Sequence, residues 1–108
     1  MMPSRWTVQD RYGNNIYLTE ERWLHIIDND NHPEMIVCED LLIETLRSGK
    51  RKQDSLNPNK FRYSKEFDDL ENFNTHIVVI VLFGHKQSKK RIPVSNNFIV
   101  TAYQKEIG

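Results

Sequence analysis

The hydrophobic and polar positions along this chain follow two patterns, one with a helical period and one with a period of two. Residues 20–28 and 33–48 carry apolar side chains at helical spacing, which predicts two amphipathic helices. Residues 61–67 and 98–104 alternate as the two faces of a strand do. The nearly continuous apolar run 76–83 (HIVVIVLF) is typical of a central strand covered on both faces.

Residues at the helix ends support these assignments. Thr19 is a suitable N-cap for the first helix, which we expect to stop in the polar run 28–31. Pro33 suits the first position of the second helix, and Gly49 suits its C-cap. The residues expected to face the core are Trp23, Leu24, Ile26 and Ile27 in the first helix and Val37, Cys38, Leu41, Leu42, Thr45 and Leu46 in the second.

Further strand signals lie on either side of the helices. Residues 6–18 read as a β-hairpin around a Tyr-Gly-Asn-Asn turn. Residues 50–60 contain a possible short strand followed by an Asn-Pro-Asn turn, and residues 84–97 form a basic hairpin loop or arm.

Together these elements predict an α+β fold in a single domain spanning residues 1–108. Two N-terminal helices would pack on one face of a four-stranded antiparallel sheet, preceded by a short β-hairpin. The other face of the sheet would be partly open and could carry Arg62, Thr101 and Tyr103. Alternation places Ile99, Thr101 and Tyr103 on one side of the last strand.

Acidic and basic side chains are concentrated in different halves of the sequence. The 108 residues hold 15 basic and 15 acidic side chains. Residues 1–45 contain three arginines and nine acids, a net charge of −6, whereas residues 46–108 contain twelve basic residues and six acids, a net charge of +6. A basic face attracts phosphates, although ordinary solvated surface with clustered signs would give the same totals.

Several classes of protein are excluded. The single cysteine, Cys38, leaves no internal disulfide and no cysteine-built zinc site. His25 and His32 do not align on one helix because Pro33 and the polar run separate them, so we expect no metal and no cofactor. The four glycines are isolated, which excludes a phosphate-binding loop. With no secretion signal and no membrane span in the sequence, a cytoplasmic protein is expected.

The remaining polar side chains suit cleavage of RNA without a metal. RNA supplies its own nucleophile, the 2′-hydroxyl, so the protein needs a proton carrier and a cation over the phosphate. Histidine titrates near neutral pH, and arginine can hold two phosphate oxygens at once. Threonine and tyrosine hydroxyls can donate hydrogen bonds to the phosphate.

Each candidate residue also has a purely structural explanation. His25 could pair with Glu21 on the helix surface. His32 could cap the second helix, whose dipole would favour Glu34 in the first turn. Arg62 could pair with an acid on the same sheet, and threonine and tyrosine are good strand formers.

Three segments taken together resemble a known group of nucleases: 22–26 (RWLHI), 32–35 (HPEM) and 98–103 (FIVTAY). The chain from about residue 19 to 105 is similar to phage-type members of the barnase–EndoU–colicin–RelE-like (BECR-fold) nuclease superfamily. Members of that group are built from two helices followed by a four-stranded antiparallel sheet. They are mostly metal-independent ribonucleases, and many are toxins.

The resemblance implies roles for particular residues of this chain. His25 would transfer the proton from the first helix, and Arg62 would bind the phosphate. The polar residues of the last strand would be Thr101 and Tyr103, and the assisting or structural residues of the second motif would be His32 and Glu34.

We therefore expect a metal-independent endoribonuclease, acting as a toxin of a toxin–antitoxin or phage-conflict system and held in check by an antitoxin or immunity protein. RNA would lie across the open sheet face. The basic residues expected to draw it there are Arg51, Lys52, Lys60, Lys86, Lys89, Lys90 and Arg91. One alternative is a non-catalytic protein- or RNA-binding module on the same scaffold, whose acidic helices dock a basic partner. Another is an accessory protein of phage origin.

Overall fold

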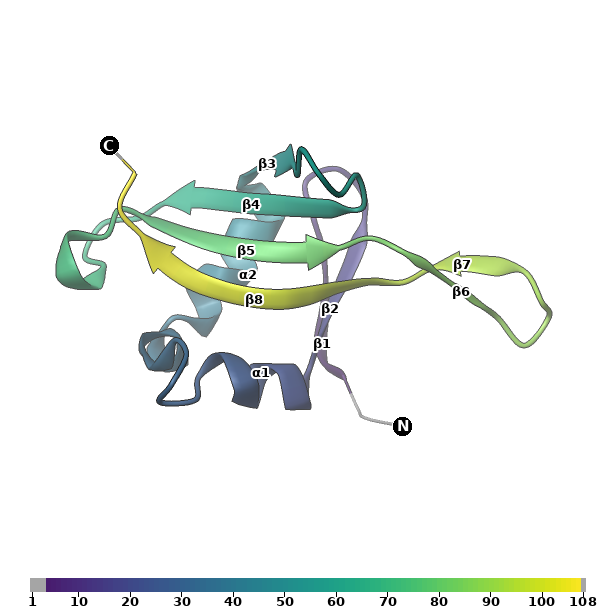
Figure 1. Ribbon diagram of the computed structural model, residues 1–108, viewed down its shortest axis with the longest axis horizontal. Coiled ribbons are helices and arrows are strands. Elements are labelled where there is room, and N and C mark those ends of the chain that lie inside the picture. The colour runs from purple at the N-terminus through teal and green to yellow at the C-terminus, as the bar shows by residue number, and fades with distance from the viewer. Residues whose placement is uncertain (1–3, 108) are drawn as a thin grey trace.

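The computed structural model describes residues 4–107 as an α+β fold with two α-helices on one face of a large sheet (Figure 1). The strands of that sheet are β1 (Ser4–Gln9), β2 (Asn15–Thr19), β3 (Lys50–Gln53), β4 (Lys60–Glu66), β5 (His76–Leu82) and β8 (Asn97–Lys105). The helices are α1 (Glu20–Ile26), α2 (Glu39–Ser48) and the 3-10 helices η1 (Pro33–Val37) and η2 (Glu71–Phe73). Strands β6 (His85–Gln87) and β7 (Pro93–Ser95) form a separate two-stranded sheet. Among residues 4–107 no helix is long and apolar enough to cross a membrane.

The main sheet is not the four-stranded antiparallel sheet expected from the sequence. It has six strands in the order β1-β2-β8-β5-β4-β3, because the N-terminal hairpin joins it. Strand β2 pairs with β8 in parallel at Ile16–Asn97 and Tyr17–Phe98, while the other pairings are antiparallel. A lone hairpin is marginally stable in water, and joining the sheet buries apolar residues of the hairpin such as Leu18.

Polar side chains secure this junction between β2 and β8. Asn97 is buried, and its Nδ2 donates to the carbonyl oxygen of Asn15 (3.0 Å). The Tyr17 hydroxyl donates to Asn96 Oδ1 (2.9 Å), and the Tyr17 ring packs against Phe98 with 6.1 Å between centroids. A parallel pairing of only two residue pairs is thus reinforced by side chains on both strands.

Helix α1 ends at Ile26 because the following chain turns back on it. The main-chain N–H of His32 donates to the carbonyl oxygen of Ile26 (2.9 Å). Within the polar run 28–31, Asp28 Oδ1 accepts from the N–H of Asp30 (2.9 Å). The run predicted to stop the helix therefore forms a closed loop that returns to the end of the helix.

The second helix, expected over residues 33–48, is broken at Cys38. Residues 33–37 form the 3-10 helix η1, and α2 begins only at Glu39 because Cys38 has non-helical torsion angles (φ −115°, ψ 15°). The break turns Val37 into solvent, where it is 78% exposed, so its predicted core position is wrong. Leu24 of α1, also expected in the core, is 62% exposed.

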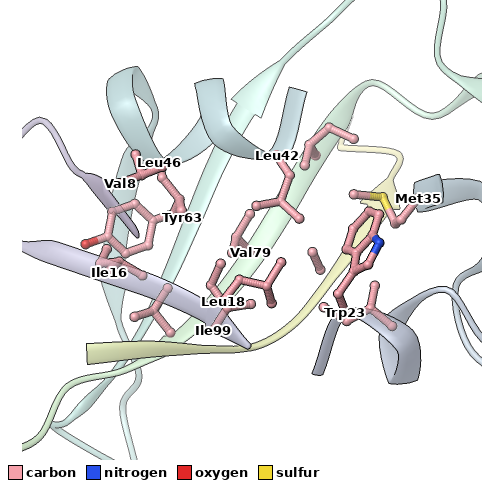
Figure 2. Close-up of a cluster of buried hydrophobic side chains, with 14 of the residues drawn as sticks. Val8, Ile16, Leu18, Trp23, Met35, Leu42, Leu46, Tyr63, Val79 and Ile99 are labelled. Atoms are coloured by element: carbon pink, nitrogen blue, oxygen red, sulfur yellow. The ribbon is translucent and has the colours of Figure 1, made fainter. Parts of the chain in front are cut away.

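The core lies between the helices and the sheet, and the N-terminal hairpin closes one side of it (Figure 2). Gly49 lets α2 approach β4 closely, because a Cβ there would lie 2.7 Å from the carbonyl oxygen of Ser64 and closer still to that of Thr45. The largest fully buried side chains are Tyr63, Ile16, Leu18, Ile26, Met35, Leu42, Leu46, Ile77, Ile99, Val78, Val79 and Val81.

A β-bulge in β8 determines which residues share a face of the sheet. Thr101 lies opposite Ile80, but Ile99 lies opposite Val81, so Val100 is an extra residue on this strand. Ile99 consequently faces the core, and its predicted place beside Thr101 is wrong. On the face away from the helices β8 carries Phe98, Thr101, Tyr103 and Lys105, which lie opposite Leu82, Ile80, Val78 and His76.

One carboxylate lies inside the protein. Asp10, in the turn between β1 and β2, accepts hydrogen bonds from the Tyr63 hydroxyl and from the N–H groups of Tyr12 (2.9 Å) and Asn14 (2.8 Å), and Arg51 Nη1 lies 3.9 Å from its Oδ2. Burial raises the pKa of Asp10, but the hydrogen bonds, led by that from Tyr63, outweigh burial and hold the pKa below its ordinary value. The cluster ties the hairpin to β3 and β4.

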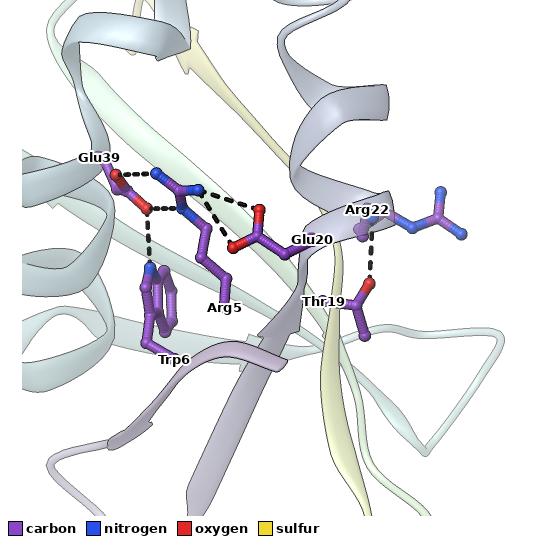
Figure 3. A network of polar contacts seen from close by, with 6 residues as sticks. All are labelled: Arg5, Trp6, Thr19, Glu20, Arg22 and Glu39. Carbon is purple, nitrogen blue, oxygen red and sulfur yellow. Dashed lines mark hydrogen bonds and ion pairs between the residues drawn. The ribbon is translucent and has the colours of Figure 1, made fainter. Parts of the chain in front are cut away.

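A second polar cluster joins β1 to both α-helices (Figure 3). Arg5 donates to Glu39 on α2 and to Glu20 on α1 (Nη1–Oε2 3.1 Å), and Trp6 Nε1 donates to Glu39 Oε2 (2.9 Å). The hydrogen bond from Arg5 lowers the pKa of Glu39. Thr19 Oγ1 accepts a main-chain N–H in the first turn of α1, as predicted for an N-cap.

Replacing Tyr63 with phenylalanine should lower the free energy of unfolding by about 1–3 kcal/mol at pH 7, because it removes a donor from a buried carboxylate. Since the pKa of Asp10 is lower in the folded protein, its contribution is present above its unfolded-state pKa of about 3.9 and is lost as the pH falls through the folded-state pKa. The cost of Tyr63→Phe should therefore shrink below about pH 4. Urea unfolding of both proteins at several pH values measures how this cost depends on pH.

The matched control is Tyr17→Phe, whose hydroxyl donates to the neutral amide of Asn96. Its cost should be about 0.5–1.5 kcal/mol and should not vary with pH. An equal, pH-independent loss in both variants would contradict the role given to Asp10.

Candidate functional site

The sheet face away from the helices is not covered by any element in the part of the chain that the structure describes (Figure 1). Four residues form a row across it, because Lys52 pairs with Arg62, Arg62 with Ile80, and Ile80 with Thr101. Neighbouring strands are about 4.8 Å apart, so the main chains of Arg62 and Thr101 are separated by roughly 10 Å. The structure thus brings two predicted site residues onto one surface.

The adjacent row runs through Lys50, Ser64, Val78 and Tyr103. Val78 is fully buried although it lies on the face away from the helices. This face, called the open face from here on, therefore has an apolar floor along β5 and polar or aromatic side chains on both sides.

His32 and Glu34 reach this face from the edge of β8. Beyond Phe98 this edge has no strand partner among the described residues, and α1 and η1 lie beside it instead. The rings of His32 and Tyr103 lie 5.4 Å apart, and His32 Nδ1 is 3.6 Å from Glu34 Oε1. His32 occupies the N-cap position of η1, as the capping explanation expects, but its side chain makes no capping hydrogen bond.

His25 is placed differently. It is exposed on α1, beside a small hollow of about 290 Å³ lined by Thr19, Glu21 and Arg22. No strand residue of the open face lines this hollow. The structure therefore does not bring His25 together with Arg62, Thr101 and Tyr103 as the resemblance implies.

Three predicted cations lie near one another at the β3–β4 side of the open face. Lys52, Lys60 and Arg62 line a hollow of about 260 Å³ together with Ile80. Within residues 4–107 neither Lys52 nor Arg62 has a carboxylate within 4 Å, and Lys60 has only Asp54, at 3.9 Å. The proposed pairing of Arg62 with an acid on the sheet is absent, so its charge is available to a ligand.

Arg51 is engaged inside the protein instead. Its guanidinium lies 4.3 Å from the ring of Tyr12, 4.5 Å from that of Phe61 and 5.5 Å from that of Phe83, beside the buried Asp10. Cation–π contacts and a buried carboxylate are structural partners. The remaining predicted cations, Lys86, Lys89, Lys90 and Arg91, lie on the projecting β6–β7 hairpin.

Cys38 is a core residue, as predicted. It is 5% exposed, and Gln104 Nε2 donates to its sulfur (3.4 Å). Burial raises the pKa of the Cys38 thiol. No group of three or more His, Cys, Asp or Glu side chains within residues 4–107 is arranged to hold a metal ion.

The sequence alone did not reveal the contact between His32 and Tyr103. The two residues are 71 positions apart, and neither the loop closure at Ile26 nor the free edge of β8 leaves a recognisable signal in the pattern. The buried Asp10 was also missed, because an acid in a hairpin turn is ordinarily exposed.

Comparison with known proteins finds no matching family model, no similar curated protein and no similar solved structure. The function must therefore be argued from the geometry of this chain.

Measuring the free energy of unfolding tests whether Arg51 has a structural role and Arg62 does not. Arg51→Ala should lower the free energy of unfolding by about 1–3 kcal/mol, because it leaves the buried carboxylate of Asp10 without its cation. The matched variant Arg62→Ala should change it by no more than about 0.5 kcal/mol. Urea unfolding of both proteins gives the comparison, and a larger loss for Arg62→Ala would show that Arg62 supports the fold.

Proposed function

We propose that this protein is an endoribonuclease that cleaves single-stranded RNA on the open face without a metal ion. The observation that carries the proposal is that His32, Tyr103, Thr101 and Arg62 lie on that one face, with only Ile80 between Thr101 and Arg62. It joins a proton carrier, two hydroxyls and an unpaired cation, which are the groups that RNA cleavage by its own 2′-hydroxyl requires.

The open face also suits RNA as a polymer. Arg62, Lys52 and Lys60 offer charge to successive phosphates. Phe98 and Tyr103 of β8 lie on the same face and flank Thr101, where they offer rings on which unpaired bases stack. Phosphate contacts and stacking together favour a single strand over a duplex, whose bases are already paired.

Each group has a definite part in the reaction. His32 accepts the proton of the 2′-hydroxyl through Nε2, and the 2′ oxygen attacks the adjacent phosphorus. Glu34, 3.6 Å from His32 Nδ1, stabilises the imidazolium that forms. Arg62 and the hydroxyls of Thr101 and Tyr103 bind the non-bridging oxygens as negative charge grows on them. The bond to the 5′ oxygen breaks, that oxygen takes a proton from solvent, and a 2′,3′-cyclic phosphate remains.

The proposal departs from the resemblance in its choice of histidine. The resemblance gives proton transfer to His25, but the contact with Tyr103 favours His32. Testing the two histidines separately decides between these assignments.

A short fluorescent single-stranded RNA should be cut in the presence of EDTA and should yield cyclic phosphate ends. His32→Ala should lower kcat by about 10²–10⁴-fold, the usual contribution of a general base. Arg62→Ala should lower it by about 10²–10³-fold, as loss of a group that stabilises transition-state charge does. The matched control is Arg47→Ala, since Arg47 lies on α2, on the other side of the sheet; its activity should stay within a few-fold of the parent.

The same assay distinguishes the competing hypotheses. Full activity in His32→Ala with loss in His25→Ala would contradict the geometry and support the assignment made by resemblance. Cleavage that requires a divalent ion would contradict the mechanism. Binding of RNA without any cleavage would identify a non-catalytic binding module instead.

A further inference from the structure

The β6–β7 hairpin projects from the end of the main sheet, continuing the directions of β5 and β8 (Figure 1). We call residues 85–95 the arm. Its two strands pair only with each other, at His85–Ser95, Lys86–Val94 and Gln87–Pro93, and all six of these residues are exposed. A two-stranded hairpin without a core is marginally stable, so a solvent-exposed arm of this kind gains stability from a partner.

The arm is strongly cationic. It carries Lys86, Lys89, Lys90 and Arg91, and the chain has no acidic residue from position 72 to position 105. None of these four cations forms an ion pair with another part of the chain that the structure describes. The charge is therefore free to meet an anionic partner.

The tip of the arm is ordered by hydrogen bonds that hold its cations together. The N–H of Arg91 donates to the carbonyl oxygen of Ser88 (2.9 Å), and the N–H of Ile92 donates to Ser88 Oγ (3.2 Å). Arg91 has φ +59°, in the left-handed region that glycine adopts more readily. An arginine at this position costs conformational energy and adds a fourth cation to the arm.

We propose that the arm binds the phosphate backbone of a paired RNA stem next to the single strand that occupies the open face. The inference rests on the proposed function and names the substrate class, which is an unpaired segment flanked by a stem. Residues 85–95 contain no Phe, Tyr or Trp on which an unpaired base could stack. Flexible lysines without aromatic rings suit a duplex, where phosphates are presented and the bases are enclosed.

The spacing between the two surfaces fits such a substrate. Eight residues separate Ile80, in the middle of the open face, from Ser88 at the tip, which corresponds to roughly 25–30 Å along an extended chain. A stem that begins beside the open face would therefore pass within reach of the cations at the tip. A hollow of about 390 Å³ lies at the base of the arm, lined in part by Asn14, Phe83 and Asn97.

The test compares two RNAs that carry 2′-O-methyl groups and therefore cannot be cleaved by 2′-hydroxyl attack. One is a single strand, and the other is the same strand followed by a hairpin stem. Fluorescence anisotropy at several salt concentrations should show tighter binding of the stem-containing RNA. The double variant Lys89→Gln/Lys90→Gln should lose that preference, with about a tenfold weaker affinity and a salt slope reduced by about 2 for this RNA. Its affinity for the single strand should be unchanged.

The matched control removes two cations far from the arm, with Arg47→Gln on α2 and Lys65→Gln on β4, and should keep the preference. If the single strand is bound and cleaved but the stem adds nothing, or if the arm variant retains the preference, the inference about the arm is wrong while the proposed function stands. If neither RNA is bound and the parent protein cleaves no RNA, both proposals fail. Circular dichroism of the arm variant confirms that the main sheet is intact.

Discussion

The parallel pairing of β2 with β8 is the constraint on which the rest of the structure depends. It covers only two residue pairs, and it is fixed by the buried Asn97 and by the contacts of Tyr17. Because it stops at Phe98, it closes the core at one end of β8 and leaves the remaining edge of that strand open. The loop after α1 occupies this edge and brings His32 to Tyr103. A longer pairing would have satisfied the edge with main-chain hydrogen bonds and displaced the histidine.

The same hairpin explains why the basic residues divide into two groups. Its turn brings Asp10 into the protein, where the carboxylate requires donors and a nearby cation. Arg51 supplies that cation from β3, and its guanidinium stacks on rings from the turn and from the ends of β4 and β5. Lys52, the next cation on β3, points to the opposite face. There it lies across from Arg62, and neither residue has an ion-pair partner within residues 4–107. Two adjacent residues of β3 therefore have different roles: Arg51 stabilises the fold, and Lys52 contributes charge to the open face.

Much of the local structure could be predicted from the sequence, but the connections between distant segments could not. Periodicity located both helices and the strands because burial acts residue by residue along each element. It placed Ile99 on the wrong face, because a bulge inserts a residue without changing the hydrophobic pattern. It also missed the six-stranded sheet, since the joining of a hairpin to a strand 81 residues later depends on packing in three dimensions. The candidate site shows the same division: Arg62 and Thr101 follow from alternation, whereas the position of His32 depends on a long-range contact.

The shape and lining of the described surface favour a polymeric ligand over a small molecule. Small-molecule sites are ordinarily concave and largely apolar, with volumes of about 300–1,000 Å³. Here the hollows near the open face are about 190–260 Å³ and are lined mainly by charged and polar side chains. A surface of this kind obtains its affinity from many repeated contacts, and a phosphate backbone supplies such repeats. Most of the acidic residues lie in the first 45 positions, which include both α-helices except the last turn of α2, so an anionic polymer is repelled from the helical layer and directed to the opposite side of the sheet. Five of the nine acids in the first 45 positions, Glu20, Glu21, Glu39, Asp40 and Glu44, lie on the two α-helices, on the other side of the sheet from Lys52 and Arg62.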